Sequence, residues 1–196
     1  MLDKPGERLW RFRDNWEDMK ASPELMDLIK IGYKIPFIKK LPLSDPRKAF
    51  STTPLPAQVE LVRRNVKDLV CKGAMRKVPW NEAIKSKGFY SKLFCIPKPG
   101  TDTWRVIINL KPLNRYIKKV SFRMEGVQDV KNILEPGMFG AIVDISDAYY
   151  HVSLHKKSRK YTRFIFEGVV YEYVALPMGL HCSPRIFTRV TKFFRL

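Results

Sequence analysis

Hydrophobic and polar positions alternate with a helical period in the first part of the chain. Apolar residues recur every three or four positions over residues 9–19, between charged ones, which predicts an amphipathic helical segment. A second helix is expected after Ser22, a good N-cap followed by proline, with Gly32 as its stop. Five prolines then interrupt residues 33–56, which indicates an extended connector before the main domain.

The pattern changes to strand-like runs after one more helix. That helix is expected over residues 57–72, with an apolar stripe that Gly73 ends. Two pairs of apolar runs flank turn-forming residues and predict β-hairpins, residues 90–96 with 104–110 and residues 161–166 with 169–174. The apolar run 139–145, which contains an acid, predicts a buried strand.

A last helix is expected where Ser183 can cap and Pro184 can open it. Its apolar side chains include Phe193 and Phe194, with no glycine, C-cap or later element to cover them. We therefore expect an exposed apolar face, marginal stability of the isolated chain, and a sequence that is cut within a domain.

Composition and charge restrict the class of protein. The 196 residues fit one domain with a small appendage, and 45% hydrophobic with 12% aromatic residues exclude a disordered tail. No apolar run approaches the roughly 20 residues of a membrane span, and the start lacks a signal-peptide core. We expect an intracellular protein, cytoplasmic or nuclear, with no membrane partner. The three cysteines, Cys71, Cys95 and Cys182, are too scattered for a disulfide framework or zinc site and are expected to be buried thiols.

The net charge points to a polyanionic partner. With 37 Lys and Arg against 19 Asp and Glu, the formal charge is 37 − 19 = +18. Such a surface attracts phosphate backbones over long distances, so nucleic acid is the favoured partner. A ribosome-like or histone-like structural protein, or lysines that only solvate the surface, also fits this composition.

Asp144 and Asp147 are the acids placed best for chemistry. An acid at the end of a buried strand is costly unless a divalent metal or a basic side chain pairs with it, and the sequence leaves both open. Two-metal phosphoryl transfer needs several carboxylates converging on ions roughly 3.5–4 Å apart. Asp144 could bridge two such ions, but at least one further acid must come from elsewhere.

Basic and aromatic residues surround these acids in the sequence. Lys98 and Arg105 bracket the first hairpin tip and could clamp a triphosphate, although a solvated charged turn fits as well. Trp104 is expected in the core. Of the neighbouring Tyr149 and Tyr150, one is expected to pack in the core while the other could floor a sugar pocket and exclude a 2′-hydroxyl.

Five segments in order resemble the fingers and first half of the palm of a reverse transcriptase. They are Phe94-Cys-Ile-Pro-Lys98, Trp104-Arg-Val-Ile-Ile-Asn-Leu-Lys-Pro-Leu-Asn114, Val143-Asp-Ile-Ser-Asp-Ala-Tyr-Tyr150, Arg159-Lys-Tyr-Thr-Arg-Phe164 and Tyr173-Val-Ala-Leu-Pro-Met-Gly-Leu-His-Cys-Ser-Pro184. The resemblance runs from about residue 57 onward and implies an α+β right-hand polymerase. It divides the chain into a helical appendage and connector (1–52), fingers (53–135) and a partial palm (136–196).

Upstream motifs resemble a narrower class of retrotransposon, the DIRS-like elements that carry a tyrosine recombinase. They are Arg8-Leu-Trp10 with Trp16, Gly32-Tyr-Lys-Ile-Pro-Phe37 and Gly88-Phe-Tyr-Ser91.

The resemblance also implies site residues, a cofactor and partners. Asp144 would be the first catalytic ligand of two Mg²⁺ ions, together with the backbone carbonyl of Ile145. The residues implied to bind the incoming deoxynucleoside triphosphate are Lys98 and Arg105 for its phosphates, the backbone N–H groups of Asp147 and Ala148, Tyr149 as sugar gate, and Met178 and Gly179 in the nucleotide and template pocket. The helix after Ser183 and Pro184 would support an RNA or DNA template–primer.

Two positions depart from the family pattern. Asn109 stands where the family usually carries Asp, at a structural position. The Tyr-x-Asp-Asp turn that supplies the remaining metal carboxylates is absent, as is any Asp-Asp pair. We therefore expect a chain truncated before that turn, which binds nucleic acid but does not polymerise alone. It is either a fragment of a retroelement reverse transcriptase or a non-catalytic nucleic-acid-binding module derived from one.

Overall fold

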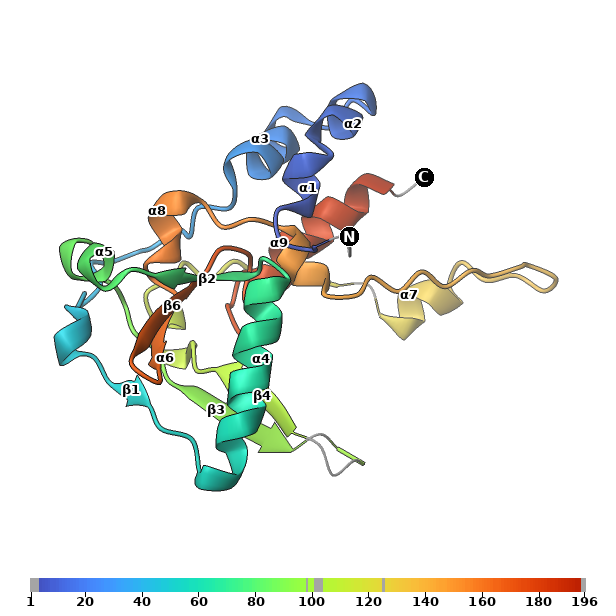
Figure 1. Ribbon diagram of the computed structural model, residues 1–196. Helices are drawn as coiled ribbons and strands as arrows, with labels where there is room; N and C mark the ends of the chain where they lie inside the picture. The colour runs from blue at the N-terminus through green and yellow to red at the C-terminus, as the bar shows by residue number, and fades with distance from the viewer. Residues whose placement is uncertain (1–3, 98, 101–103, 125, 195–196) are drawn as a thin grey trace.

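A four-stranded mixed sheet lies at the centre of the computed structural model, which describes residues 4–97, 99–100, 104–124 and 126–194 (Figure 1). Its strand order is β1-β5-β6-β2, with β2, β6 and β5 antiparallel and β1 parallel to β5. The strands are β1 (Ser51–Thr52), β2 (Met75–Val78), β5 (Arg163–Phe166) and β6 (Val169–Tyr173). Sequence analysis had missed β2, which is only four residues long.

The turn between β5 and β6 follows directly from the sequence. Glu167 and Gly168 form a two-residue loop with φ of 49° and 72°. Positive φ at both loop residues is the type I′ geometry, whose twist matches the flanking antiparallel strands. The hairpin predicted from this dipeptide is therefore confirmed.

A second, two-stranded sheet projects from the body (Figure 1). It pairs β3 (Leu93–Pro97) with β4 (Trp104–Ile108), as the sequence predicted. Its inner end is buried at Leu93 and Ile108, whereas Trp104 at the outer end is 43% exposed. The expectation that Trp104 belongs to the core is wrong, because the hairpin carries it away from the main body.

Helices cover the sheet and fill the space beyond it. The helices of the main body are α4 (Val59–Cys71), α5 (Trp80–Lys85), α6 (Lys111–Asn114), α8 (Lys156–Arg159) and α9 (Ser183–Thr191), with short 3₁₀ turns η1 (Pro46–Lys48), η2 (Pro56–Gln58), η3 (Ala148–His151) and η4 (Lys192–Phe194). The apolar stripe of α4 buries Val62, Val66 and Leu69. Gly73, with φ of 69°, follows this helix as predicted. Within the described residues, no helix has both the length and the apolar character needed to cross a bilayer.

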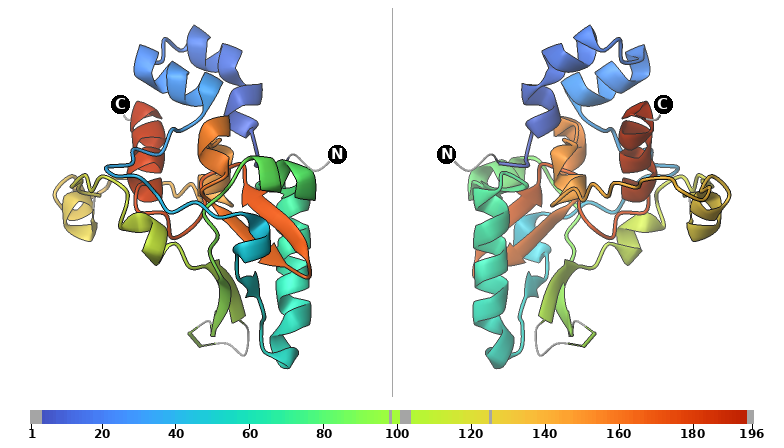
Figure 2. Two further views of the ribbon diagram at one scale, coloured as in Figure 1. Left: turned by 90° about the vertical axis from the view of Figure 1, so that its left-hand side faces the viewer. Right: turned by 90° about the vertical axis from the view of Figure 1, so that its right-hand side faces the viewer.

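The N-terminal helices pack against the last helix. They are α1 (Arg8–Arg11), α2 (Arg13–Asp18) and α3 (Pro23–Ile31), and Figure 2 shows them above α9 in both views. Ser22 caps α3 as predicted, with Oγ accepting the Leu25 N–H at 3.3 Å. The ring of Trp16 lies 5.3 Å from that of Phe193. Phe193 is half-buried in the main core, so the predicted exposure of this side chain is wrong.

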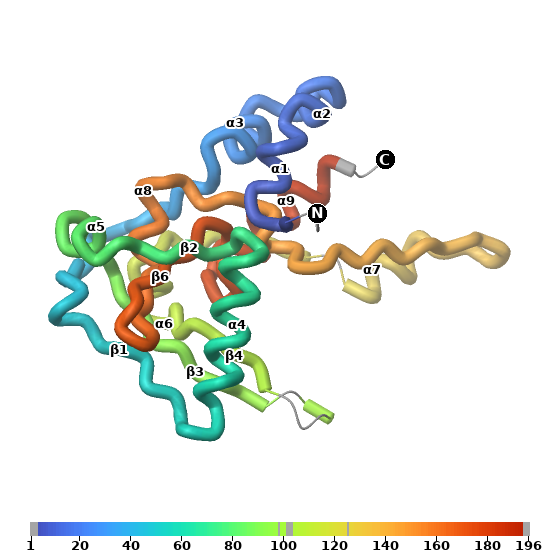
Figure 3. The backbone as a smooth tube through the Cα atoms, viewed as in Figure 1, coloured from blue at the N-terminus to red at the C-terminus, as the bar shows by residue number. Residues whose placement is uncertain are grey.

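An extended arm runs from residue 120 to residue 145 and leaves the body (Figures 1 and 3). It carries the short helix α7 (Val127–Lys131) and returns to the body just before η3. The predicted buried strand over residues 139–145 is wrong, since Phe139 is 104% and Ile142 98% exposed. A strand needs a neighbouring ladder to satisfy its backbone, and none of the described strands pairs with this run.

Two smaller expectations are also wrong. Ser183 does not cap α9, because its Oγ donates to the Pro177 carbonyl at 2.9 Å and the N-cap residue is Cys182. Cys71 is exposed rather than buried, while Cys95 is half-buried and Cys182 is buried. Burial raises the pKa of the Cys182 thiol.

Candidate nucleotide and nucleic-acid site

Asp147 opens η3 in a left-handed conformation, with φ of 55° and ψ of 31°. Its Oδ2 lies 3.0 Å from Nζ of Lys72, which also pairs with Asp68 at 2.8 Å. The hydrogen bonds that Lys72 donates to Asp68 and, to a lesser degree, to Asp147 raise the pKa of Lys72. Of the two interpretations that the sequence left open, a pair with a basic side chain is the one observed for Asp147.

Asp144 lies next to Ile145, where the arm returns to the body just before η3. It forms no ion pair with any described residue, and both residues are exposed. The part of the chain that the structure describes contains no group of three or more His, Cys, Asp or Glu side chains placed to hold a metal ion. The described residues therefore do not form a two-ion site, which would require carboxylates in addition to Asp144.

Tyr149 and Tyr150 face different surroundings, as predicted for neighbours at this position. Tyr150 is buried, and desolvation raises its pKa to about 12. Tyr149 is half-buried, with its ring 5.8 Å from that of Phe187 on α9 at an interplanar angle of 73°. The edge-to-face packing fixes the Tyr149 ring at the side of η3.

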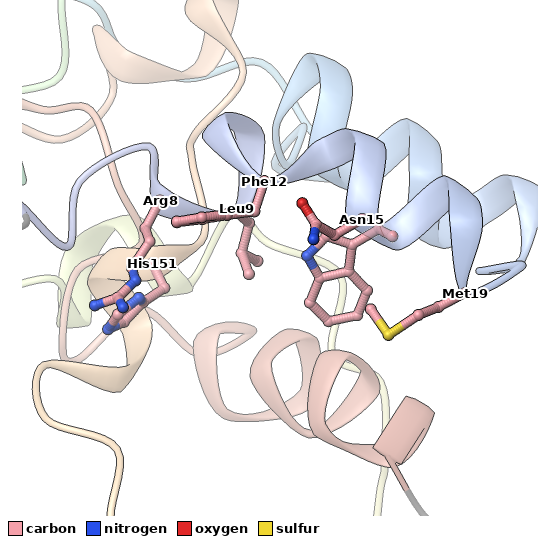
Figure 4. Close-up of a pocket in the computed structure, with 7 residues that line it drawn as sticks. Arg8, Leu9, Phe12, Asn15, Met19 and His151 are labelled. Carbon is pink, nitrogen blue, oxygen red and sulfur yellow. The ribbon is translucent and has the colours of Figure 1, made fainter.

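Two histidines, one at the end of η3 and one four residues later, form local hydrogen bonds. His151 Nε2 lies 3.0 Å from the Ser146 carbonyl, and His155 Nδ1 accepts the Lys157 N–H at 3.2 Å. His151 also borders a pocket of about 340 Å³ whose other lining residues come from α1, α2 and the residues next to them (Figure 4). Figure 4 shows Arg8 beside His151 at one end of this pocket and Met19 at the other. The N-terminal helices thus form a wall next to η3.

Of the two residues expected to clamp a triphosphate, Lys98 and Arg105, the structure describes Arg105. Arg105 is exposed on β4 opposite Ile96 of β3, and it pairs with no acid among the described residues. Lys98 lies outside the described residues. The roles of Arg105 and Lys98 as a phosphate clamp stay a prediction.

A tight turn at Met178 and Gly179 contacts the end of β4 and α6. Met178 is exposed, and Gly179 has φ of 88°, a conformation that favours glycine. A Cβ at Gly179 would lie 3.7 Å from the Ile108 carbonyl oxygen of β4. The Asn114 amide joins α6 to this turn, since its Nδ2 donates to the Gly179 carbonyl at 2.8 Å and its Oδ1 accepts the His181 N–H at 3.0 Å.

Asn109 precedes α6 and helps to shape this junction. Its Oδ1 accepts the Lys111 N–H at 3.2 Å, and its own N–H donates to the Lys92 carbonyl at 2.8 Å. The Lys111 N–H needs only a side-chain oxygen as its acceptor. Asn109 can therefore form the same hydrogen bond as the Asp expected here from the resemblance.

A basic pocket adjoins this turn, and sequence reasoning missed it. Its volume is about 600 Å³, and it is lined by Ile38, Lys111, Asn114, Arg115, Ile117, Lys119 and His181. No acidic residue is in this lining, and its lysines and arginine form no ion pair with a described residue. The run of basic residues from 111 to 119 was the available signal. These basic residues come close to His181 because the His181 N–H donates to Asn114, which is 67 positions away in the sequence. The sequence pattern gives no sign of that bond.

The chain is similar in sequence to two Gag-Pol polyproteins. The chain is 29% identical over 140 residues to the Gag-Pol polyprotein of bovine immunodeficiency virus (strain R29), covering 68% of this chain and 9% of the relative. It is 31% identical over 98 residues to the Gag-Pol polyprotein of walleye dermal sarcoma virus, covering 50% of this chain and 6% of the relative. The chain thus spans a small part of the relatives that it matches.

A solved structure shares the fold. It is described as the foamy viral protease-reverse transcriptase dRH in complex with double-stranded DNA, with a TM-score of 0.60 at 16% identity. The likeness covers 92% of this chain and 34% of that chain. The family model for reverse transcriptase (RNA-dependent DNA polymerase) matches residues 96–195, just over half of the chain. With β4, α6, the Met178–Gly179 turn and η3 inside that match, the chain belongs to the reverse transcriptase family.

Proposed function

We propose that this chain supplies the fingers (53–135) and the first part of the palm (136–196) of a retroelement reverse transcriptase. The polymerase would synthesise DNA on an RNA template from deoxynucleoside triphosphates. Residues 1–52 form a helical appendage with its connector, and their motifs, with Gly88-Phe-Tyr-Ser91, favour an element of the DIRS-like class. The observation that carries this proposal is the basic pocket that Asn114 joins to the Met178–Gly179 turn.

Each part of the site has a distinct role in this proposal. The basic pocket holds phosphates of the template strand, because it offers several cationic donors and no competing acid. Arg105, with Lys98, holds the phosphates of the incoming nucleotide. Met178 and Gly179, at the turn that contacts the end of β4 and bonds to Asn114, are proposed to line the nucleotide and template pocket.

The turn η3 would receive the sugar and the triphosphate. Tyr149, fixed by its contact with Phe187, is proposed to exclude a 2′-hydroxyl by steric contact. The N–H groups of Asp147 and Ala148 open the turn, where a helical segment leaves its first donors unpaired. These donors are proposed to bind the triphosphate.

Magnesium binding is proposed for Asp144 and the carbonyl of Ile145. The described residues alone do not fit a complete two-ion site. We therefore propose that the other carboxylates come from polypeptide outside these 196 residues, and we derive no catalytic step from this chain alone.

A second candidate function rests on the incomplete metal site. Described residues that hold no complete metal site but line a basic pocket fit a nucleic-acid-binding module without catalysis. The two proposals differ in one measurable respect. Both the polymerase and the binding module are expected to bind template–primer. An in-frame Tyr-x-Asp-Asp in the downstream coding sequence would support the polymerase and not the binding module.

The basic pocket is tested by replacing its cations. The triple variant Lys111→Gln, Arg115→Gln, Lys119→Gln is expected to weaken binding of an RNA/DNA template–primer and to flatten its dependence on salt. Losing three phosphate contacts lowers the slope of log K against log salt by about 2–3. Fluorescence anisotropy between 50 and 200 mM salt, about the range in which such contacts are measured, gives this slope.

A charge-matched control separates a local contact from a general effect of charge. Lys20→Gln, Lys67→Gln, Lys77→Gln removes three exposed lysines that form no ion pair with a described residue. This control is expected to change the slope far less. Equal slopes for the wild type and the pocket variant would contradict the proposed template contact.

A further inference from the structure

A second basic pocket lies between α5 and α8, over one face of the central sheet. Its floor is a row of three charged residues on neighbouring strands. Arg76 of β2 and Arg163 of β5 are both directly opposite Glu172 of β6. Residues paired across strands share one face of a sheet, so the three side chains meet there.

Hydrogen bonds fix this floor in place. Glu172 accepts from Nε of Arg76 at 2.8 Å and from Nε of Arg163 at 2.9 Å. Arg163 and Glu172 have only 2% of their side-chain surfaces exposed. The Arg163 guanidinium also donates to the carbonyl and hydroxyl oxygens of Ser86 at 2.8 and 2.9 Å.

Together with Glu82 of α5, the floor is electrically neutral. Arg76 donates to Glu82 as well, with Nη2 at 2.5 Å from Oε1. Two guanidiniums therefore face two carboxylates, and both carboxylates are occupied. The hydrogen bond from Arg76 lowers the pKa of Glu82, which keeps this acid charged. The floor therefore adds no net charge to the pocket and offers no unpaired carboxylate to a cation.

The rim, in contrast, is cationic. The pocket has a volume of about 450 Å³, and its rim carries Lys156, Lys157 and Lys160 from α8 and its end. None of the three forms an ion pair with any residue that the structure describes. Lys160 lies over the ring of Tyr161, with Nζ 5.4 Å from the ring centroid. The five cations and two acids of the lining leave an excess of three positive charges.

We propose that this pocket is a second binding site for phosphate groups, separate from the template and nucleotide surface. Lysines offer donors without acceptors, so a ligand must bring negative charge and acceptor oxygens together. Three rim lysines over a pocket of about 450 Å³ fit a ligand with more than one phosphate. Such phosphates occur in a free polyphosphate or in the backbone of a nucleic-acid strand.

The position of this pocket sets it apart from the site already described. Its lining shares no residue with the template pocket of Lys111, Arg115 and Lys119. In Figure 1, α5 lies to the left of β6 and α8 above it, whereas the β3–β4 hairpin lies below the sheet and the arm extends to the right. A strand bound here would therefore be one that has left, or not yet reached, the template surface.

The test uses the 196-residue chain and tripolyphosphate as the probe. Isothermal titration calorimetry is expected to show saturable binding, which Lys156→Gln, Lys157→Gln, Lys160→Gln weakens about tenfold or more. The Lys20→Gln, Lys67→Gln, Lys77→Gln control is expected to bind tripolyphosphate as the wild type does. Absence of saturable binding, or equal binding by the rim variant, overturns the proposal.

A second measurement locates the ligand and identifies its source. Tripolyphosphate is expected to protect the three rim lysines from acetylation, as read by mass spectrometry, and protection elsewhere only would contradict the site. Displacement of tripolyphosphate by a single-stranded RNA 12-mer assigns the pocket to a nucleic-acid backbone, and lack of displacement assigns it to free polyphosphate. Loss of template–primer binding in the Lys111, Arg115, Lys119 variant tests the proposed function independently of both results.

Discussion

Replacing Asp144 with Asn in a polypeptide that contains the complete polymerase is expected to abolish primer extension. The amide keeps the size of the side chain but removes the negative charge on which the proposed Mg²⁺ ligation depends. A loss of several kcal/mol of transition-state stabilisation corresponds to about a thousandfold lower rate. Extension of a labelled primer on an RNA template measures the rate, and anisotropy measures the binding of the same template–primer.

Binding is expected to survive this substitution, because Asp144 is exposed and belongs to neither basic pocket. Asp129→Asn is the matched control, since Asp129 lies on the same arm but bonds to Arg123 and to the Gly126 N–H. Its extension rate is expected to stay within a fewfold of the wild type. Normal extension by the Asp144 variant would exclude this residue as a metal ligand.

Replacing Glu172 with Leu is expected to cost about 3–5 kcal/mol of folding stability. The substitution leaves the Arg163 guanidinium buried with no carboxylate opposite it, whereas Arg76 keeps Glu82. For a chain of this size, such a loss lowers the melting temperature by about 6–20 °C. Thermal or urea unfolding followed by circular dichroism gives the change.

Two further variants separate the buried pair from the exposed one. Arg163→Met combined with Glu172→Leu removes both buried charges and is expected to recover much of the lost stability. Glu82→Gln breaks a half-exposed pair and is expected to cost about 1 kcal/mol or less. A Glu172→Leu variant as stable as the wild type would show that Arg163 finds another partner or reaches water.

Elements that depend on neighbouring residues could be predicted from the sequence. Ser22 and the following proline define the start of α3, and Gly73 follows α4, because caps act within one turn of the helix. The hairpin at Glu167-Gly168 is equally local, since two residues with positive φ determine the turn.

Features that depend on distant residues could not be predicted. The run over residues 139–145 has the composition of a buried strand, but burial requires a partner strand that its own sequence does not specify. Phe193 is covered by Trp16, a residue at the other end of the chain.

The candidate site shows the same division. Asp144 was proposed from an acid in an apolar run, but the structure forms no strand over that run, and the role of Asp144 as a metal ligand stays a prediction. The pairing of Asp147 with Lys72, and the approach of His181 to α6, join segments far apart in the sequence. Such contacts follow from tertiary packing, which neither residue type nor spacing encodes.

The contact between Trp16 and Phe193 makes one tryptophan a natural fluorescent reporter of the chain ends. Trp16 is 5% exposed, whereas the other three tryptophans, Trp10, Trp80 and Trp104, are each more than 40% exposed. A red shift of the emission on unfolding will therefore come mainly from Trp16, as water reaches its indole ring. That signal follows the separation of the first helices from the last one, whereas circular dichroism follows the backbone as a whole. Coincident transitions would mean that the two ends of the chain unfold in one cooperative unit with the central sheet.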